Sequence, residues 1–289
     1  MNIHNSVKSI QKKPIQIVLQ PEKGWQPINW RELRDYKDLL FFLVTRDVKV
    51  VYKQTIFGFA WAIINPLFSM IIFTIIFGNL VDVSSDGVPY PLFSYVALVP
   101  WAYFSSTMNA STLSLVSNAS MLTKVYFPRL VFPMTPVFAK LVDFAVASII
   151  IGVLMVWHKT PLSVSILLLP VLTLLMMLTA AGIGMWLSAL AIQYRDVKHL
   201  MPVVSQILMY AAPVVWPASL ISERFGTTAR LLYGLYPMAG VIEGFRSAIL
   251  QTNPMPWDLI GLGSVSALAI AISGAFYFKR MEMIFADVA

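Results

Sequence analysis

Six long apolar stretches dominate this sequence, and they constrain the fold more than any other feature. A helix needs about 20 mostly apolar residues to cross a bilayer, and each stretch is long enough. The sequence therefore predicts an all-α integral membrane protein with six transmembrane helices. The predicted spans are Phe57–Val81, Leu92–Ser117, Val131–Trp157, Leu162–Gln193, Leu200–Leu220 and Asp258–Phe278.

The connections between these stretches alternate in charge. Basic residues follow the second, fourth and sixth stretches, whereas two aspartates follow the first and a single lysine follows the third. Loops on the cytoplasmic side of membrane proteins carry the excess of Lys and Arg, so both termini are predicted to be cytoplasmic. The deciding residues are Lys124, Arg129, Arg195, Lys198, Lys279 and Arg280 inside, and Asp82, Asp86 and Lys159 outside.

The composition excludes an ordinary soluble domain and argues against binding to nucleic acid. Only 12% of the residues are charged, against about 25% in soluble globular domains. Most of the net charge of +7 lies before Lys53, where the cytoplasmic side of a membrane protein is expected to be basic. The sequence contains no cysteine, which excludes disulfides and thiolate metal sites.

The chain before the first stretch divides into a polar tail, residues 1–36, and an amphipathic segment, residues 37–55. At about 100° per residue, the Leu and Val side chains of this segment cover one broad face, and Arg46, Lys49 and Lys53 gather on the other. This pattern is typical of a helix lying in the membrane interface, with a solvated juxtamembrane helix as the alternative. Asp47 projects from the apolar side, and we expect it to pair with Arg46, Lys49 or a neighbouring subunit.

The region 221–256 is the least regular part of the predicted membrane domain. Its apolar pieces, Ala229–Leu235 and Met238–Leu250, are too short to span, and both ends of the region should lie on the external side. Broken backbone at membrane depth is tolerated where it is buried in protein or lines a wet cavity. We therefore predict short re-entrant helices that act as a gate, with an external apolar hairpin as the alternative. The predicted gate residues are Tyr233, Tyr236, Pro237 and the i,i+3 pair Glu243 and Arg246.

Sequence patterns for catalysis and metal binding are absent. The chain has no GxxxxGK[ST] phosphate loop, HExxH or GxSxG motif, and its three histidines lie far apart. Charge within the predicted spans is limited to Lys140 and Asp143, each of which alone costs about 2.5–3.5 kcal/mol at a helix centre. Their i,i+3 spacing predicts a buried ion pair, and a structural role is favoured over a proton relay.

Small polar and aromatic residues are dense in the first two predicted spans. Ser, Thr and Asn form two stripes along the second span; helix–helix hydrogen bonds account for one stripe, and a wet pathway accounts for the other. Many aromatic residues belong to interfacial belts, but Trp and Tyr also offer flat faces with a polar handle, which suits stacking on sugar rings. The predicted conduit residues are Trp61, Tyr95, Trp101, Tyr103, Phe104, Ser105, Asn109 and Thr112.

Five motifs, taken in order along the chain, resemble a known family. They are RDVKVVYKQTIFGFAWAIINPL from Arg46, LVPWAYFSS from Leu98, SNASMLTKVYFPRLVFP from Ser117, YRDVKHLMPVVSQILMYAAPVVWP from Tyr194 and YPMAGVIEGFRSAIL from Tyr236. Together they resemble the permeases of ABC exporters for O-antigen, capsular polysaccharide and teichoic acid, from about Leu39 to Arg280. Where this family usually has Asn-Pro-Met, the chain has Tyr236-Pro237-Met238 and so lacks that asparagine in the gate.

The resemblance implies a homodimer of six-span subunits bound to two cytoplasmic ATPase subunits, which would bind ATP and magnesium in place of this chain. It implies that the segment 118–129 is a coupling helix that docks in the ATPase. The amphipathic helix would form a second ATPase contact, and Trp216–Trp257 would form the external gate. The coupling residues carried over are Lys124, Tyr126, Phe127 and Arg129, together with Arg46, Asp47, Lys49 and Lys53 of the amphipathic helix.

These observations predict the permease subunit of an ATP-driven exporter that moves a lipid-linked polysaccharide across the bacterial inner membrane. This chain would then not be an enzyme, because ATP hydrolysis would take place in the partner subunit. An ABC permease that exports a drug or a lipid is the nearest alternative. A membrane enzyme acting on lipid-linked sugars and a purely structural anchor are more distant ones.

Overall fold

The computed structural model describes residues 34–53, 57–122, 127–161, 163–282 and 285. Within these ranges the chain forms helices joined by turns and no strand, which confirms the predicted all-α class. The elements are α2 (Lys37–Lys53), α3 (Ala60–Phe73), the π-helical η1 (Thr74–Leu80), α4 (Tyr90–Ser117), α5 (Ala119–Leu122), α6 (Val131–Trp157), the 3-10 turn η2 (Val164–Leu168), α7 (Leu169–Ala191), α8 (Val197–Ala211), α9 (Ser219–Gly234), α10 (Pro237–Leu250) and α11 (Trp257–Met281).

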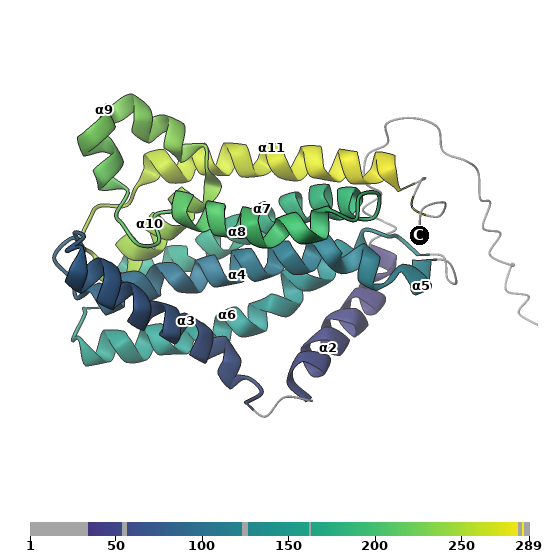
Figure 1. Ribbon diagram of the computed structural model, residues 1–289, viewed down its shortest axis with the longest axis horizontal. Coiled ribbons are helices and arrows are strands. Elements are labelled where there is room, and N and C mark those ends of the chain that lie inside the picture. The colour runs from purple at the N-terminus through teal and green to yellow at the C-terminus, as the bar shows by residue number, and fades with distance from the viewer. Residues whose placement is uncertain (1–33, 54–56, 123–126, 162, 283–284, 286–289) are drawn as a thin grey trace, which may run out of the picture.

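The helices form an elongated bundle with two distinct ends. Figure 1 shows α4, α6, α7, α8 and α11 running along the long axis, with α3 and α2 on one side. The short helix α5, the start of α2 and the end of α11 lie together at one end, which we call the α5 end. Helices α9 and α10 lie at the opposite end, the α9 end.

Four segments in the described part of the chain are both long and apolar enough to cross a membrane. They are α3 with η1, α6, η2 with α7, and α11. Helix α4 has 28 residues, which also exceeds the about 20 residues that a bilayer requires, but its composition is more polar. Helix α8 has 15 residues and is shorter than that length. Helices are thus present at all six predicted positions, and four of them satisfy both criteria.

The segment between α8 and α10 differs from the prediction in its boundaries. The predicted fifth span continued to Leu220, but the helix ends at Ala211, Ala212 is extended, and Pro213 and Pro217 follow. Proline lacks the N–H that a helix interior requires and disfavours helical backbone in the residue before it. The following helix α9 begins well before the predicted Ala229 and bends at Gly226, whose φ is 83°; glycine adopts this backbone region at low cost.

Helix α4 is the centre of the hydrophobic core. It packs against α6, α7 and α10, and its largest side chains, including Phe93, Tyr95, Phe104 and Met108, are fully buried. Two hydroxyls inside this core find carbonyl acceptors on α6: the Tyr95 hydroxyl donates to Ala147 O at 3.2 Å, and the Tyr103 hydroxyl donates to Val137 O at 2.7 Å. The fold therefore places the second predicted span in the interior of the subunit.

Glycines allow two close helix crossings beside this core. A Cβ on Gly274 of α11 would lie 2.5 Å from Gly182 O of α7, and a Cβ on Gly240 of α10 would lie 2.6 Å from Leu259 O of α11. Small residues allow the backbones of membrane helices to approach each other in this way. Helix α11 thus binds α7 along its length and holds α10 against the α9 end of the bundle.

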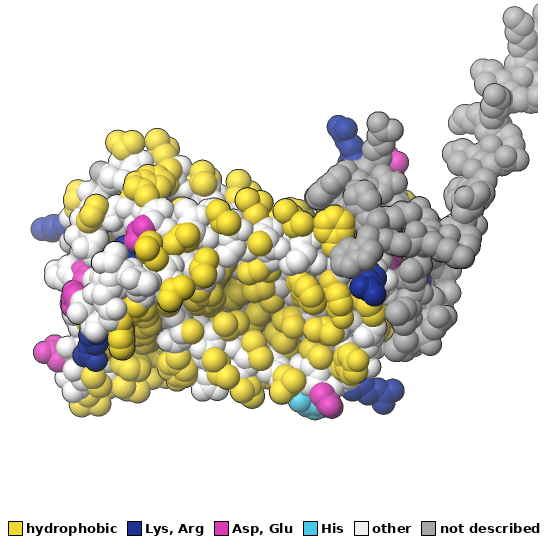
Figure 2. Space-filling model, turned by 90° about the horizontal axis from the view of Figure 1, so that it is seen from above, with side chains coloured by type: hydrophobic (Ala, Val, Ile, Leu, Met, Phe, Trp, Pro, Cys, Tyr) yellow, Lys and Arg dark blue, Asp and Glu magenta, His cyan; other side chains and the backbone are white. Residues whose placement is uncertain are grey.

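Charged side chains are confined to the two ends of the face shown in Figure 2. Among the described side chains on that face, Lys, Arg, Asp and Glu lie at both ends, and hydrophobic side chains cover the middle. The exposed apolar residues of α6 and α7, such as Ile149, Val153, Val171 and Leu174, are those expected against lipid tails. This distribution is that of a protein whose middle zone lies in hydrocarbon.

Candidate functional site

The amphipathic helix α2 is attached to the α5 end of the bundle through Arg46. Its guanidinium donates to Asp47 Oδ1 at 2.8 and 3.0 Å and to Asn118 Oδ1 at 3.2 Å, and it lies 3.9 Å from Met121 Sδ. Asn118 follows α4 directly, and Met121 lies in α5. The expected pairing of Asp47 with Arg46 is confirmed. Arg46 therefore links α2 to the end of α4 and to α5.

The remaining basic residues predicted in α2 lie on its outer side. Lys49 and Lys53 are exposed and line a shallow depression with Phe42 and Thr45. Their ammonium groups therefore lie where a protein partner or anionic headgroups can reach them. Arg46 lines the same depression, so the three basic residues share one side of α2, and from there the Arg46 guanidinium also reaches Asn118.

The predicted coupling segment, residues 118–129, is helical only over Ala119–Leu122 in the described part of the chain. Lys124 and Tyr126 lie outside the described residues. Phe127 is buried and packs at 5.2 Å between ring centroids against Phe132. This contact fixes the entry into α6 and leaves the Phe127 ring inside the subunit.

Arg129, the last predicted coupling residue, is held by the C-terminal part of the chain. Its guanidinium donates to Glu282 O, its backbone N–H donates to Glu282 Oε1 at 3.3 Å, and it lies 5.9 Å from the Phe285 ring centroid. Glu282 also accepts a hydrogen bond from Lys279 at 2.8 Å. Sequence reasoning missed Glu282 and Phe285, because 153 positions separate Arg129 from Glu282. The i,i+3 spacing of Lys279 and Glu282 was the available signal.

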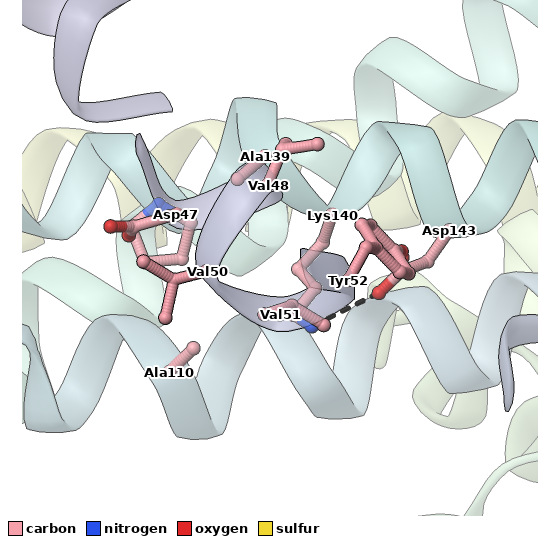
Figure 3. Close-up of a pocket in the computed structure, with 10 residues that line it drawn as sticks. Asp47, Val48, Val50, Val51, Tyr52, Ala110, Ala139, Lys140 and Asp143 are labelled. Carbon is pink, nitrogen blue, oxygen red and sulfur yellow. Dashed lines mark hydrogen bonds and ion pairs between the residues drawn. The ribbon is translucent and has the colours of Figure 1, made fainter. Parts of the chain in front are cut away.

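A small pocket of about 260 Å³ separates α2 from α4 and α6. Figure 3 shows its two charged groups on α6, Lys140 and Asp143, joined beneath α2, with Asp47 of α2 also lining the pocket. The Lys140 Nζ to Asp143 Oδ2 distance is 3.0 Å, which confirms the predicted pair. Because each ion partly neutralises the other, α6 can carry both charges beside apolar neighbours.

The predicted conduit aromatics of α4 lie in the interior of the subunit. Tyr95, Trp101, Tyr103 and Phe104 are all buried, and the two tyrosine hydroxyls are bonded to α6. These four rings therefore do not lie on a surface along which a polymer could slide. A membrane helix in a protein core and one facing lipid both carry apolar residues, so this burial cannot be recognised from the sequence. Trp61 of α3, by contrast, is 44% exposed.

The polar conduit residues of α4 face α8. Asn109 Nδ2 donates to Ser105 O and to Ser205 Oγ of α8, each at 2.8 Å. Ser105 and Asn109 are partly exposed, whereas Thr112 is buried and its hydroxyl donates to Met108 O. On α8 the neighbouring Gln206 is exposed. Ser105, Asn109 and Ser205 thus form a short polar strip at the α4–α8 edge.

A buried ion pair joins the predicted gate helix α10 to the core. Arg246 Nη1 lies 2.8 Å from Glu243 Oε1, which confirms the predicted pair, and the exposed fractions of their side chains are 3% and 9%. Arg246 also donates to Val214 O, Trp216 O and Phe93 O, and its guanidinium lies 3.6 Å from the Phe93 ring centroid.

The carboxylate of this pair is also bound by backbone. Glu243 Oε1 accepts a hydrogen bond from Ala218 N at 2.9 Å. The pair thus ties α10 to the start of α4 and to the turn segment 212–218 between α8 and α9. The Tyr90 hydroxyl of α4 also donates to Val215 O of this segment at 2.8 Å, so side chains of both helices hold it.

The other predicted gate residues also connect α9 and α10 to their neighbours. The Tyr233 hydroxyl donates to Ala211 O and the Tyr236 hydroxyl to Leu208 O, both on α8. Pro237 is the first residue of α10, where its missing N–H and fixed φ suit a helix start. Arg230 and Asp258 pair at 2.5 Å between α9 and α11, and this hydrogen bond raises the pKa of Arg230. The α9 end is therefore braced against α8 and α11.

Metal ligands are not gathered anywhere in the described part of the chain: no three His, Asp or Glu side chains there lie close enough to hold an ion. The charged side chains of the site instead form pairs and bridges between helices.

Comparison with known proteins places these features in a family. The model of the ABC-2 type transporter family matches residues 38–250. The chain is 27% identical over 255 residues to the O-antigen export system permease protein RfbA of Myxococcus xanthus, covering 87% of this chain and 96% of that protein. It is 27% identical over 252 residues to the protein of the same name from Klebsiella pneumoniae, covering 87% and 95%. It is 24% identical over 213 residues to the polysialic acid transport protein KpsM of Escherichia coli, covering 72% and 80%.

Proposed function

Because the chain belongs to the ABC-2 type transporter family, we propose that it is the permease subunit of an ATP-driven exporter for a lipid-linked polysaccharide. The observation that carries this proposal is the similarity to O-antigen export permeases, which extends over 87% of the chain. A relative named for polysialic acid transport supports a glycan substrate as well. The substrate class is thus O-antigen, capsule or teichoic acid.

The architecture we propose has six membrane crossings in the bacterial inner membrane. Two of them differ from the other four: α4 is less apolar, and α8 is shorter. The α5 end faces the cytoplasm, because Arg129, Arg195 and Lys279 lie near it and basic residues favour that side. Both termini are then cytoplasmic, and α9 and α10 form a re-entrant hairpin on the external side.

Two copies of the chain enclose the conduit, with the α4–α8 edge on its wall. Exposed Gln206 of α8 supports this assignment, since a polar side chain is unfavourable against lipid and favourable beside a wet passage. Ser105 and Asn109 continue the strip on α4, and Trp61 is the conduit aromatic that remains accessible. The apolar outer face of α8 around Val203 and Ile207 is available to the second copy.

Two ATPase subunits drive transport from the α5 end. Their nucleotide cycle displaces α5 and the neighbouring segment up to Arg129, and Arg46 carries the displacement into α2. Lys49 and Lys53 lie on the outer side of α2, where they contact the ATPase. At the other end, the Glu243–Arg246 pair keeps α10 and the segment 212–218 together as one gate element.

The test of this function is the fate of surface polysaccharide in cells that lack the gene. Export by this permease predicts that polymer disappears from the surface and accumulates inside, and that the wild-type gene restores it. Gln206→Leu should restore export less well than the control variant Ile149→Leu on the lipid-facing side of α6. Normal surface polymer in the deletion strain would refute the proposal, and accumulation of a drug or free lipid instead would favour the alternative ABC permease.

A further inference from the structure

A second cavity, much larger than the pocket beneath α2, opens on the outside of the bundle between α6, η2, α7 and α10. Its volume is about 650 Å³, which is within the range of small-molecule binding sites, roughly 300–1,000 Å³. Ile151 and Met155 of α6 and Phe245 and Ile249 of α10 are buried at its floor. Leu174 of α7 stands exposed at its rim. We call this cavity the α6–α7 groove.

The walls of the groove contain no polar group that requires water. Its two hydroxyl side chains are already satisfied by their own helices: Ser148 donates to Phe144 O at 2.7 Å and Thr173 donates to Leu169 O at 2.8 Å. Because the groove opens on the outside of the bundle and has no unpaired polar group, an apolar chain can enter it without leaving a hydrogen bond unmade. The groove is therefore suited to hydrocarbon.

The position of the groove identifies where the hydrocarbon comes from. One wall of the groove is α6, and another is η2 together with α7. Each of these two segments is long and apolar enough to span a membrane. Met155 of the groove lies two residues before the exposed Trp157, the last residue of α6, and four before the exposed Lys159 at the α9 end. Tryptophan and lysine at a helix end mark the level of the headgroups. The groove thus begins beneath the headgroups and extends along the acyl chains.

Gly152 leaves the groove open on its α6 side. It lines the groove, and a Cβ added to it would meet nothing within 4 Å. At Gly182, Gly240 and Gly274, by contrast, a neighbouring backbone excludes any side chain. The absence of a side chain at Gly152 thus widens the groove where an acyl chain would lie. Gly261 of α11 has equally open surroundings but does not line the groove.

From these observations we infer that the α6–α7 groove binds one acyl chain of a membrane phospholipid from the leaflet at the α9 end. The phosphate of that lipid lies at Lys159, which is exposed in the turn two residues after α6 and complements its charge. Since Phe245 and Ile249 belong to α10, the bound chain completes the packing of the helix that carries the Glu243–Arg246 pair. The inference requires only that α6 and α7 lie in the bilayer, and it holds for any transported substrate.

Photolabelling of the full-length protein in lipid nanodiscs tests this site. The probe is phosphatidylglycerol with a diazirine in the middle of one acyl chain, and labelled peptides are mapped by mass spectrometry. We expect labels on the α6, α7 and α10 peptides that line the groove. In Gly152→Leu these labels should fall about tenfold, which corresponds to about 1.4 kcal/mol of binding free energy. The matched control is Gly261→Leu on α11, where a Cβ also meets nothing within 4 Å, and it should leave the labels unchanged.

Three results would overturn the inference. Equal labelling of wild type and Gly152→Leu would show only bulk lipid at the surface. Labelling by a diazirine-bearing polyprenyl phosphate that excess phospholipid does not reduce would assign the groove to a lipid carrier. A change of oligomeric state in Gly152→Leu without loss of lipid would assign it to a second copy.

A final comparison tests the headgroup part of the inference. The wild type should take up the phosphatidylglycerol probe in preference to a diacylglycerol probe with the same diazirine, and Lys159→Gln should abolish the preference. Equal uptake of the two probes by the wild type would refute the role of Lys159.

Discussion

Arg246→Met is expected to destabilise this protein by about 3–5 kcal/mol, because removal of one partner leaves the other charge buried without compensation. The exposed fraction of the Arg246 side chain is 3% and that of Glu243 is 9%, so water does not replace the lost partner. In the variant Glu243 keeps only its hydrogen bond from Ala218 N. The carbonyls of Val214 and Trp216 lose their donor at the same time.

Glu243→Gln is expected to be milder, at about 1–3 kcal/mol. Arg246 then retains three carbonyl acceptors and the face of the Phe93 ring, and the amide preserves the shape of the carboxylate. The double variant should be less destabilised than the sum of the two single variants, with a coupling of about 1–3 kcal/mol, as is found for residues in direct contact.

The assay is denaturant unfolding of the detergent-solubilised protein, followed by tryptophan fluorescence. Arg230→Met is the control, because the Arg230–Asp258 pair is far more exposed and such pairs contribute about 1 kcal/mol or less. If Arg246→Met proved no more destabilising than Arg230→Met, or if the double variant were strictly additive, the pair would not be what binds α10 to the segment 212–218.

Three further changes test the connections along the bundle. Arg46→Met should leave ATP hydrolysis by the reconstituted transporter intact but lower export per ATP more than Lys49→Met does, because Arg46 alone reaches Asn118; equal effects would contradict this. Glu282→Ala should cost about 1 kcal/mol by removing the acceptor of Arg129 N–H, seen as a lower unfolding midpoint, and an unchanged midpoint would exclude the contact. Gly240→Ala should cost about 1–3 kcal/mol through overpacking against Leu259 O, whereas Gly261→Ala should be neutral or stabilising in the same measurement.

Sequence reasoning succeeded where a single helix contains the relevant pattern. Apolar runs bounded by charge or proline located α6 and α11 within a few residues, and the i,i+3 spacing identified both the Lys140–Asp143 and the Glu243–Arg246 pairs. These features depend on local geometry, since residues three apart lie on one helix face. The amphipathic helix α2 was recognisable for the same reason.

The features that the sequence did not reveal depend on how helices are arranged around each other. Tyr95 and Trp101 are buried in the core, but apolar side chains facing protein and those facing lipid look alike in a membrane helix. The bond from Arg46 to Asn118 and that from Arg129 to Glu282 join residues far apart in the chain. Gly152 is notable only because the three-dimensional structure leaves open space beside it.

The most direct test of the account is ATP-dependent movement of a glycan across a membrane that contains this chain. The purified chain, reconstituted in vesicles with its ATPase, should carry a labelled lipid-linked polysaccharide to the side opposite the ATPase, where it becomes resistant to added glycosidase. That protection should require ATP and should be lost when the ATPase alone is present. Protection of the glycan that is independent of ATP would contradict the proposed role in polysaccharide export. The role would also be contradicted if the glycan stayed unprotected while ATP was hydrolysed and a drug or free lipid was moved.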